Sequence, residues 1–455
     1  MAQPELAPVG VKHVFWLVWV WLYRKLSKWL GRNLRWVVAA LLCIVTIINY
    51  VDRQTLSVIA PILTRPAEQG GLGMTPQQYS YITSSFLIAY VFGQALGGIV
   101  MDKLGTRIGF AVILTWWSIA TICHRFAGSV FSFAFWRATL GLGEAGNWPG
   151  AIKSIAEWFP AKERGFATGI FNLGSSTGAV IAPPLIVWIT THFGWRNAFV
   201  LAGSLGFLWL AAWLWFYRLP RQHSRITPAE LTYIESGQES TAREERTEKL
   251  PWFTLLRYRQ VWGILIPRLL AEPVWWFYLF WLPTYLVQTR GLSLTKMALG
   301  ALLPYITADL GCLVGGGASS LLIRHGWSVN RARKTVMVAA AFLMPAALFV
   351  FQAQSPWTAV ALICLATFGH QAWSTNLLIL PADLFPQRVV ASVTGIGGLG
   401  IAASAIAQLT IGYVIAHFSY KPVFTAAGLL HPTAAIMMLL LVGTCLLYTS
   451  DAADE

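Results

Sequence analysis

The sequence predicts an all-α membrane protein with twelve transmembrane helices in two pseudo-symmetric six-helix bundles. Three observations lead to this fold class. First, 56% of the 455 residues are hydrophobic and only 11% are charged, whereas soluble domains carry roughly a quarter charged residues. Second, runs of about 20 apolar residues, the length that crosses a bilayer as a helix, recur along the chain. Third, two distant segments repeat each other.

The apolar runs set the order of the elements. They start near residues 36, 78, 107, 131, 166, 195, 260, 297, 335, 356, 389 and 421. The polar stretch 220–250 divides them six and six. The predicted parts are a cytoplasmic or interfacial segment (1–35), a first bundle (36–218), a cytoplasmic linker (219–259), a second bundle (260–447) and a non-native tail (448–455). In the linker, ITPAEL predicts a helix start, with Thr227 as cap, Pro228 in the first turn and Glu230 three residues on.

The repeat indicates how the halves are related. AEWFPAKERGFATGIFNLG (156–174) and ADLFPQRVVASVTGIGGLG (382–400) align without gaps, sharing an acid before Phe-Pro, Thr-Gly-Ile and Leu-Gly. Each segment lies where the fourth span of its half leads to the fifth. Duplicated six-helix halves with a substrate path between them are an architecture of secondary transporters.

The net charge of +14 is explained by topology. Lys and Arg concentrate before the first span and in alternate loops, as expected of cytoplasmic loops. We therefore predict that both termini are cytoplasmic and that the chain binds no nucleic acid. The Trp-rich segment 14–30 is predicted to be an interfacial helix. The five cysteines lie in separate apolar spans without metal-type spacing, so no metal site is expected.

Ionisable residues inside the spans are few, because a central charge costs about 2.5–3.5 kcal/mol on insertion scales. NYVDRQTLSV places Asp52 and Arg53 near the middle of the first span, and the fourth span holds Arg137 and Glu144 about two turns apart on one face. One interpretation is ion pairing between helices, Asp52 with Arg137 or Glu144 with Arg53. The other is proton-coupled uptake of an organic anion. A carboxyl group in a low dielectric can exchange a proton near physiological pH, and arginine stays charged and matches a carboxylate.

Span seven carries further candidates. Arg268 and Glu272 are spaced i, i+4 and are predicted to pair with one another. Pro273 is predicted to break the helix where freed carbonyls can face a cavity. Trp275 and Trp276 are candidates for stacking on a sugar ring, with an aromatic packing cluster as the alternative.

Span ten contains FGHQAWSTN, a dense polar group that includes Gln371 and Ser374. These side chains are candidates for binding substrate hydroxyls. Hydrogen bonding between helices is the alternative, and His370 alone does not define a proton site.

Several motifs resemble a known family. G-x-x-x-D-K-x-G-x-R resembles the loop motif of the major facilitator superfamily. Its residues are expected to gate or brace the cytoplasmic face; they are Gly98, Asp102, Lys103, Gly105 and Arg107. NYVDRQTLSV and R-x6-E resemble the anion:cation symporter family within it. Longer blocks, such as YSYITSSFLIAY, PRLLAEPVWW and FGHQAWS, resemble bacterial hexuronate transporters, and the likeness extends from about residue 36 to 440.

The resemblance implies alternating access driven by protons in a bacterial inner membrane. By comparison with galactonate transporters, it implies Asp52 and Glu144 as protonation sites. The implied substrate and coupling positions are Tyr50, Arg53, Tyr90 and Arg137. Ser175 stands where galactonate transporters have Gln, which indicates a different sugar acid.

We therefore expect a monomeric proton symporter for a hexuronate, in contact with membrane lipid, without cofactor or enzymatic activity. The alternatives are a carrier of the same fold for an aldonate, a tartrate-like acid or a sugar phosphate, or a sensor without transport.

Overall fold

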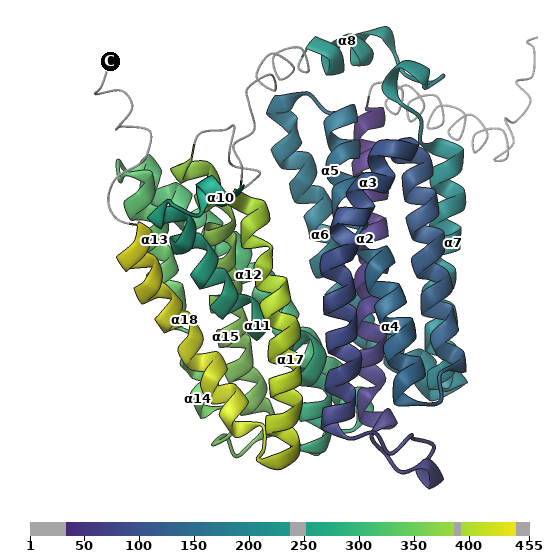
Figure 1. Ribbon diagram of the computed structural model, residues 1–455, viewed down its shortest axis with the longest axis vertical. Coiled ribbons are helices and arrows are strands. Elements are labelled where there is room, and N and C mark those ends of the chain that lie inside the picture. The colour runs from purple at the N-terminus through teal and green to yellow at the C-terminus, as the bar shows by residue number, and fades with distance from the viewer. Residues whose placement is uncertain (1–32, 237–251, 386–392, 443–455) are drawn as a thin grey trace, which may run out of the picture.

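The computed structural model describes residues 33–236, 252–385 and 393–442, and this part of the chain is all-helical, as predicted (Figure 1). One group of helices comprises α2 (Leu34–Leu63), α3 (Pro76–Cys123), α4 (Val130–Glu144), α5 (Asn147–Trp158), α6 (Ala161–Phe193) and α7 (Trp195–Phe216). The second comprises α11 (Arg259–Gln288), α12 (Leu294–Arg324), α13 (Val329–Ala341), α14 (Ala346–Phe349), α15 (Pro356–Leu384), α17 (Leu399–His417) and α18 (Lys421–Val442). The short elements are η1 (Ala67–Gln69), η2 (His124–Phe126), η3 (Pro220–Gln222), α8 (Pro228–Ser236) and α10 (Trp252–Leu255).

The outer surface fits a bilayer. In the described part of the chain, eight helical segments are long and apolar enough to cross a membrane. Large apolar side chains face outward on many of them, for example Leu313 at 72% and Phe342 at 74% exposure. Contiguous apolar surface of this kind is stable against hydrocarbon rather than water. The chain is a multi-pass membrane protein.

Most predicted span starts agree with the helices. The runs predicted near residues 36, 78, 131, 195, 260, 297, 356 and 421 begin in helices that start at 34, 76, 130, 195, 259, 294, 356 and 421. Two helices begin earlier than the runs predicted near 166 and 335: α6 at Ala161 and α13 at Val329. The reason is that each opens with a polar turn, which an apolar pattern does not register.

The predicted spans two and three correspond to the two arms of α3, which bends at Gly105. This residue has φ +72° and ψ 162°, a conformation that glycine adopts without the Cβ clash of other residues. No atom lies within 4 Å of the position that a Cβ would take there. The bend therefore depends on backbone freedom and not on space.

The two groups of helices contact one another along three pairs. Here α17 lies along α3, α12 along α6 and α11 along α2 (Figure 1). Three hydrogen bonds between side chains and the other group are found in the described part: Tyr79 Oη to the Phe280 carbonyl at 2.9 Å, Ser84 Oγ to the Ala405 carbonyl at 3.0 Å, and Gln288 Nε2 to Thr64 Oγ1 at 2.7 Å. All belong to the half of the molecule that holds the α2–α3 loop, at the end opposite α8.

A glycine contact closes the same end. A Cβ built on Gly412 of α17 would lie 2.3 Å from the Ser80 Cβ of α3. Only a residue without a side chain allows this approach. The two groups are thus closed against each other on the face opposite the linker helix.

The repeat has the same local structure in both halves. Phe159 ends α5 with φ −121° and ψ 137°, and Phe385 ends α15 with φ −123° and ψ 149°. Each donates its N–H to the carbonyl four residues earlier, at 2.9 and 3.1 Å. The preceding acids both bond the start of another helical arm in their half: Glu157 accepts from Thr106 at 2.7 Å, and Asp383 from Arg333 at 3.0 Å. The sequence repeat therefore marks a repeated turn.

The linker helix is capped as predicted. Thr227 Oγ1 accepts from the Glu230 N–H at 3.3 Å, and α8 begins at Pro228. Glu230 itself is buried and accepts from the backbone N–H of Leu34 (3.2 Å) and of Arg35 (3.3 Å). The predicted linker helix is therefore docked on the first turn of α2. The predicted interfacial helix (14–30) and the tail (448–455) lie outside the described residues, and the bundle boundaries remain predictions.

Candidate functional site

Helix α2 carries the charged pair into the interior. All thirteen residues from Val51 to Leu63 are buried, so this part of the helix is surrounded by protein on every side. Asp52 and Arg53 lie at its start, with 0% and 2% exposure. Two ionisable groups so deep must be paired, or face a functional cavity, to persist.

Arg53 pairs with Glu144 of α4. Its Nε lies 3.0 Å from Glu144 Oε2, and Nη2 lies 3.0 Å from the same oxygen. Nη2 also donates to Asn49 Oδ1, one turn earlier on α2, at 3.0 Å. The other carboxylate oxygen, Glu144 Oε1, is buried without a hydrogen-bond partner. Of the two ion pairs considered from the sequence, this one forms.

Helix α4 ends at Glu144. A turn at Ala145 and Gly146 separates it from α5, so the fourth span is interrupted beside the carboxylate. Interrupted helices of this kind occur in membrane proteins where the backbone borders a cavity or an ion site. This break is not among the features predicted from the sequence, although E-A-G-N-W-P contains a glycine and a proline close to the acid.

Aromatic rings surround the Arg53 guanidinium. Its Cζ lies 4.8 Å from the ring centroid of Tyr50, 5.2 Å from that of Tyr90, and 5.4 Å from those of Phe86 and Trp276. Such contacts contribute about 0.5–2 kcal/mol each, depending on desolvation. Trp276 belongs to α11, so both groups of helices enclose this cation. Asn49 and Phe86 were not predicted as site residues, although each stands four residues from a predicted site residue on the same helix.

Arg137 does not pair with Asp52. It is fully buried and donates an Nη2 hydrogen bond to the Arg53 carbonyl, and its Cζ lies 5.0 Å from the Phe86 ring centroid. Neither carboxylate oxygen of Asp52 has a hydrogen-bond partner, and neither does Trp117 Nε1. The ion pair considered between Asp52 and Arg137 is absent, because the arginine is turned to the α2 backbone.

The remaining predicted residues fall in different places. Ser175 of α6 lies beside the Tyr50 hydroxyl. Trp275 points elsewhere: it stacks on His370, with ring centroids 5.5 Å apart and an interplanar angle of 9°. The structure thus separates Trp275 from Trp276.

Span ten contributes more packing than was predicted. His370 Nδ1 lies 3.0 Å from His431 Nε2, and Asn376 Nδ2 donates to the Gly315 carbonyl at 3.1 Å. Both side chains therefore join helices within the second group. Gln371 and Ser374 are half-buried.

Two predictions for span seven are wrong. Helix α11 runs without a break through Pro273. Arg268 and Glu272 form no ion pair among the described residues. The Arg268 guanidinium extends along the neighbouring helix, with its Nη1 2.8 Å from the position of a Cβ on Gly397.

The motif predicted to gate or brace the cytoplasmic face joins α3 to its neighbours on the linker face. Asp102 accepts from Lys153 Nζ of α5 at 2.7 Å, and Arg107 donates to the Leu214 carbonyl of α7 at 2.5 Å. Gly105 supplies the bend between them. Lys103 is exposed and makes no side-chain hydrogen bond in the described structure. A Cβ on Gly98 would meet no atom within 4 Å. The motif connects three helices at one end of the first group.

The described helices form a multi-pass membrane protein in which a buried ion pair of the first group lies beside an aromatic ring of the second. The family model of the Major Facilitator Superfamily matches residues 42–408, and the chain belongs to that superfamily.

Within the superfamily, the chain is similar to transporters of sugar acids. The chain is 36% identical to the "Hexuronate transporter" of Escherichia coli K12 over 409 residues, covering 90% of this chain and 94% of the relative. It is 36% identical to the "Galacturonate transporter" of Dickeya chrysanthemi over 334 residues, covering 72% of this chain and 94% of the relative. Among solved structures, it is similar to a D-xylose–proton symporter with TM-score 0.66 at 16% identity, covering 90% and 97% of the two chains. The relatives are transporters, as predicted, and not enzymes.

Proposed function

We propose that this protein imports a hexuronate, such as glucuronate or galacturonate, together with protons. One observation carries the proposal: an arginine enclosed by aromatic rings and paired with a single glutamate, in a chain whose relatives include hexuronate and galacturonate transporters. A guanidinium binds a carboxylate, and aromatic faces suit a sugar ring. Arg53 is proposed to bind the substrate carboxylate, while Tyr50, Tyr90, Ser175 and Trp276 contact the ring.

The proposed function also implies a membrane topology. We count twelve crossings: the two arms of α3 are two, and α4 with α5, and α13 with α14, are one each. The proposed bundles are 36–218 and 260–447. Both termini and α8 lie on the cytoplasmic side of a bacterial inner membrane, where the basic loops belong. Since the groups are bonded together on the opposite face, the structure corresponds in this reading to an inward-facing state.

In the proposed cycle, the Arg53 guanidinium alternates between two partners, the Glu144 carboxylate and the carboxylate of the substrate. In the outward-facing state Glu144 takes up a proton and releases the guanidinium, which then binds the sugar acid. After the groups rock, Glu144 loses the proton to the cytoplasm and the ion pair re-forms, which expels the anion. The Arg53–Glu144 bond in the present structure suits the end of this cycle. No cofactor is required, because the proton gradient supplies the driving force.

Asp52 is proposed to carry the second exchangeable proton. Both its oxygens are buried without partners, and an isolated carboxylate is costly in such a place, whereas a carboxylic acid is not. Arg137 donates to the carbonyl of Arg53, the residue that follows Asp52. We propose that Arg137 is the cation that responds when Asp52 ionises. Asp52→Asn is therefore expected to alter proton stoichiometry and to leave hexuronate binding intact.

Uptake into proteoliposomes tests the proposal. Labelled glucuronate, galacturonate, galactonate and phosphate are offered with and without an inward pH gradient. We expect gradient-driven uptake of the two hexuronates, and loss of all uptake in Arg53→Ala. Uptake of phosphate or galactonate alone would replace the hexuronate by a phosphorylated anion or an aldonate. Absence of uptake of all four would reject transport of this substrate class.

A further inference from the structure

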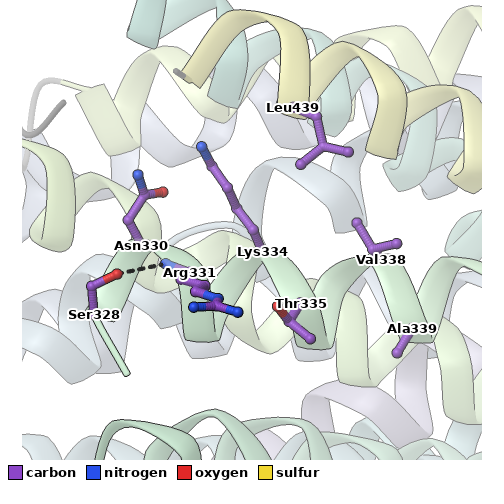
Figure 2. A pocket seen from close by; sticks show the side chains of 8 residues that line it. All are labelled: Ser328, Asn330, Arg331, Lys334, Thr335, Val338, Ala339 and Leu439. Atoms are coloured by element: carbon purple, nitrogen blue, oxygen red, sulfur yellow. Dashed lines mark hydrogen bonds between the residues drawn. The ribbon is translucent and has the colours of Figure 1, made fainter. Parts of the chain in front are cut away.

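A groove lies between α13 and α18, away from the Arg53 site. It has a volume of about 800 Å³. Its lining, shown in Figure 2, is polar at the start of α13, with Ser328, Asn330, Arg331, Lys334 and Thr335, and apolar further along, with Val338, Ala339 and Leu439. Figure 2 shows Leu439 of α18 above Val338 and the polar side chains gathered at one end. One end of the groove therefore suits a charged group and the other a hydrocarbon chain.

The groove opens on the surface that faces lipid. Both helices fall in segments apolar enough to cross the membrane. Their neighbouring side chains are outward-facing and apolar, with Phe342 at 74%, Ile436 at 56% and Leu440 at 57% exposure. The ring of Trp327, just before α13, lies beneath the Arg331 guanidinium, with Arg331 Cζ 4.3 Å from the ring centroid. Tryptophan is enriched at the level of lipid headgroups, so the polar end of the groove lies at that level.

The polar end is cationic. Arg331 forms no ion pair within the described residues, in contrast to Arg333 on the same helix, which bonds Asp383 at 3.0 Å. Lys334 follows Arg331 by three residues on α13, and both side chains line the groove. The first turn of the helix adds a partial positive charge. A cationic end that continues into an apolar lining matches a phospholipid, which joins an anionic phosphate to an acyl chain.

We propose that this groove is a binding site for an anionic phospholipid, with the phosphate between Arg331 and Lys334 and an acyl chain along Val338, Ala339 and Leu439. A free phosphate would use only the polar end and leave the apolar lining uncovered. Basic pockets between transmembrane helices at the cytoplasmic face are known to bind such headgroups. The site is separate from sugar acid transport and stands or falls independently of it.

Lipid titration of the purified, delipidated protein tests the site. Binding of dioleoylphosphatidylglycerol and dioleoylphosphatidylcholine is measured by native mass spectrometry. We expect phosphatidylglycerol to bind in preference, and the Arg331→Gln/Lys334→Gln variant to bind it roughly 30-fold more weakly, from about 1 kcal/mol for each cation near a membrane surface and 1.4 kcal/mol for each tenfold. Arg196→Gln/Lys421→Gln removes the same charge from the opposite face and should change nothing.

The apolar half is tested separately. Ala339→Phe fills the groove without changing charge and should abolish the bound phosphatidylglycerol. Glycerol 3-phosphate added in excess should not displace the lipid. Equal binding of the two lipids by the unmodified protein, an unchanged preference in the double-glutamine variant, or displacement by glycerol 3-phosphate would each overturn the proposal. Native mass spectra and melting temperature of every variant show whether it is folded.

Discussion

Replacing Glu144 by glutamine removes the proposed proton-binding group and keeps a hydrogen-bond acceptor for Arg53. Glutamine keeps an oxygen that can accept from Arg53, at the position now held by Oε2. Removing one partner of a buried pair outright costs about 3–5 kcal/mol. A neutral acceptor retains about half of a charge-assisted hydrogen bond, so we expect a smaller loss, about 1–2 kcal/mol, and a folded protein. The proton-binding group, however, is gone.

The expected result is a transporter that exchanges but does not concentrate. Each proton moved with a substrate allows about a tenfold concentration ratio per pH unit, since one pH unit corresponds to about 1.36 kcal/mol. With one proton on Glu144 and one on Asp52, the unmodified protein should accumulate glucuronate about a hundredfold across one pH unit in the absence of a membrane potential. Because a proton on Glu144 is what releases Arg53 in the proposed cycle, Glu144→Gln should equilibrate near a ratio of one and still exchange internal for external label.

The matched control is Glu230→Gln. Glu230 is also buried and also bonded to an arginine, Arg35 at 3.1 Å, but it lies on the linker helix. This variant should lose stability and keep gradient-driven accumulation. If Glu144→Gln still accumulates glucuronate against its gradient, or if Glu230→Gln fails in the same way, the assignment of the proton to Glu144 is wrong.

Three further substitutions test the framework. Gly412→Ala places a Cβ against Ser80, an overpacking that costs the closed contact roughly 1–3 kcal/mol. Uptake should fall about tenfold or more while substrate binding at the outer face persists. Normal uptake would contradict closure at this contact. Gly105→Ala should lower the free energy of unfolding by about 1 kcal/mol, because its φ of +72° is strained for alanine; an unchanged melting temperature would show that the bend relaxes. Burial lowers the pKa of His223, so the folded state disfavours its protonation and stability should fall as pH drops below about 6.5. His223→Phe should remove that part of the pH dependence of the melting temperature, and an identical profile would refute it.

Much of the fold can be predicted from the sequence because membrane spans are local patterns. A run of apolar residues has to be a helix of membrane length, and Thr227-Pro228 and Gly105 act within a single turn. The repeat also predicts a repeated structure, and the turns at Phe159 and Phe385 have matching backbone angles.

The site is less predictable because its contacts are not local. The sequence left open whether Glu144 or Arg137 would meet the charges of α2, since both choices satisfy helix spacing. The outcome depends on the turn after Glu144 and on which backbone carbonyl lies near Arg137. The Arg268–Glu272 prediction fails for the same reason: i, i+4 spacing permits a pair, but the long arginine side chain packs along the helix around Gly397 instead.

The rings around Arg53 do not all belong to one rigid unit. Tyr50, Phe86 and Tyr90 belong to the first group of helices, and Trp276 belongs to the second. A rocking motion that separates the groups therefore removes one wall from this cation and admits water beside it. The strength with which a single guanidinium holds an anion then changes between the two ends of the motion, although no residue of α2 has moved.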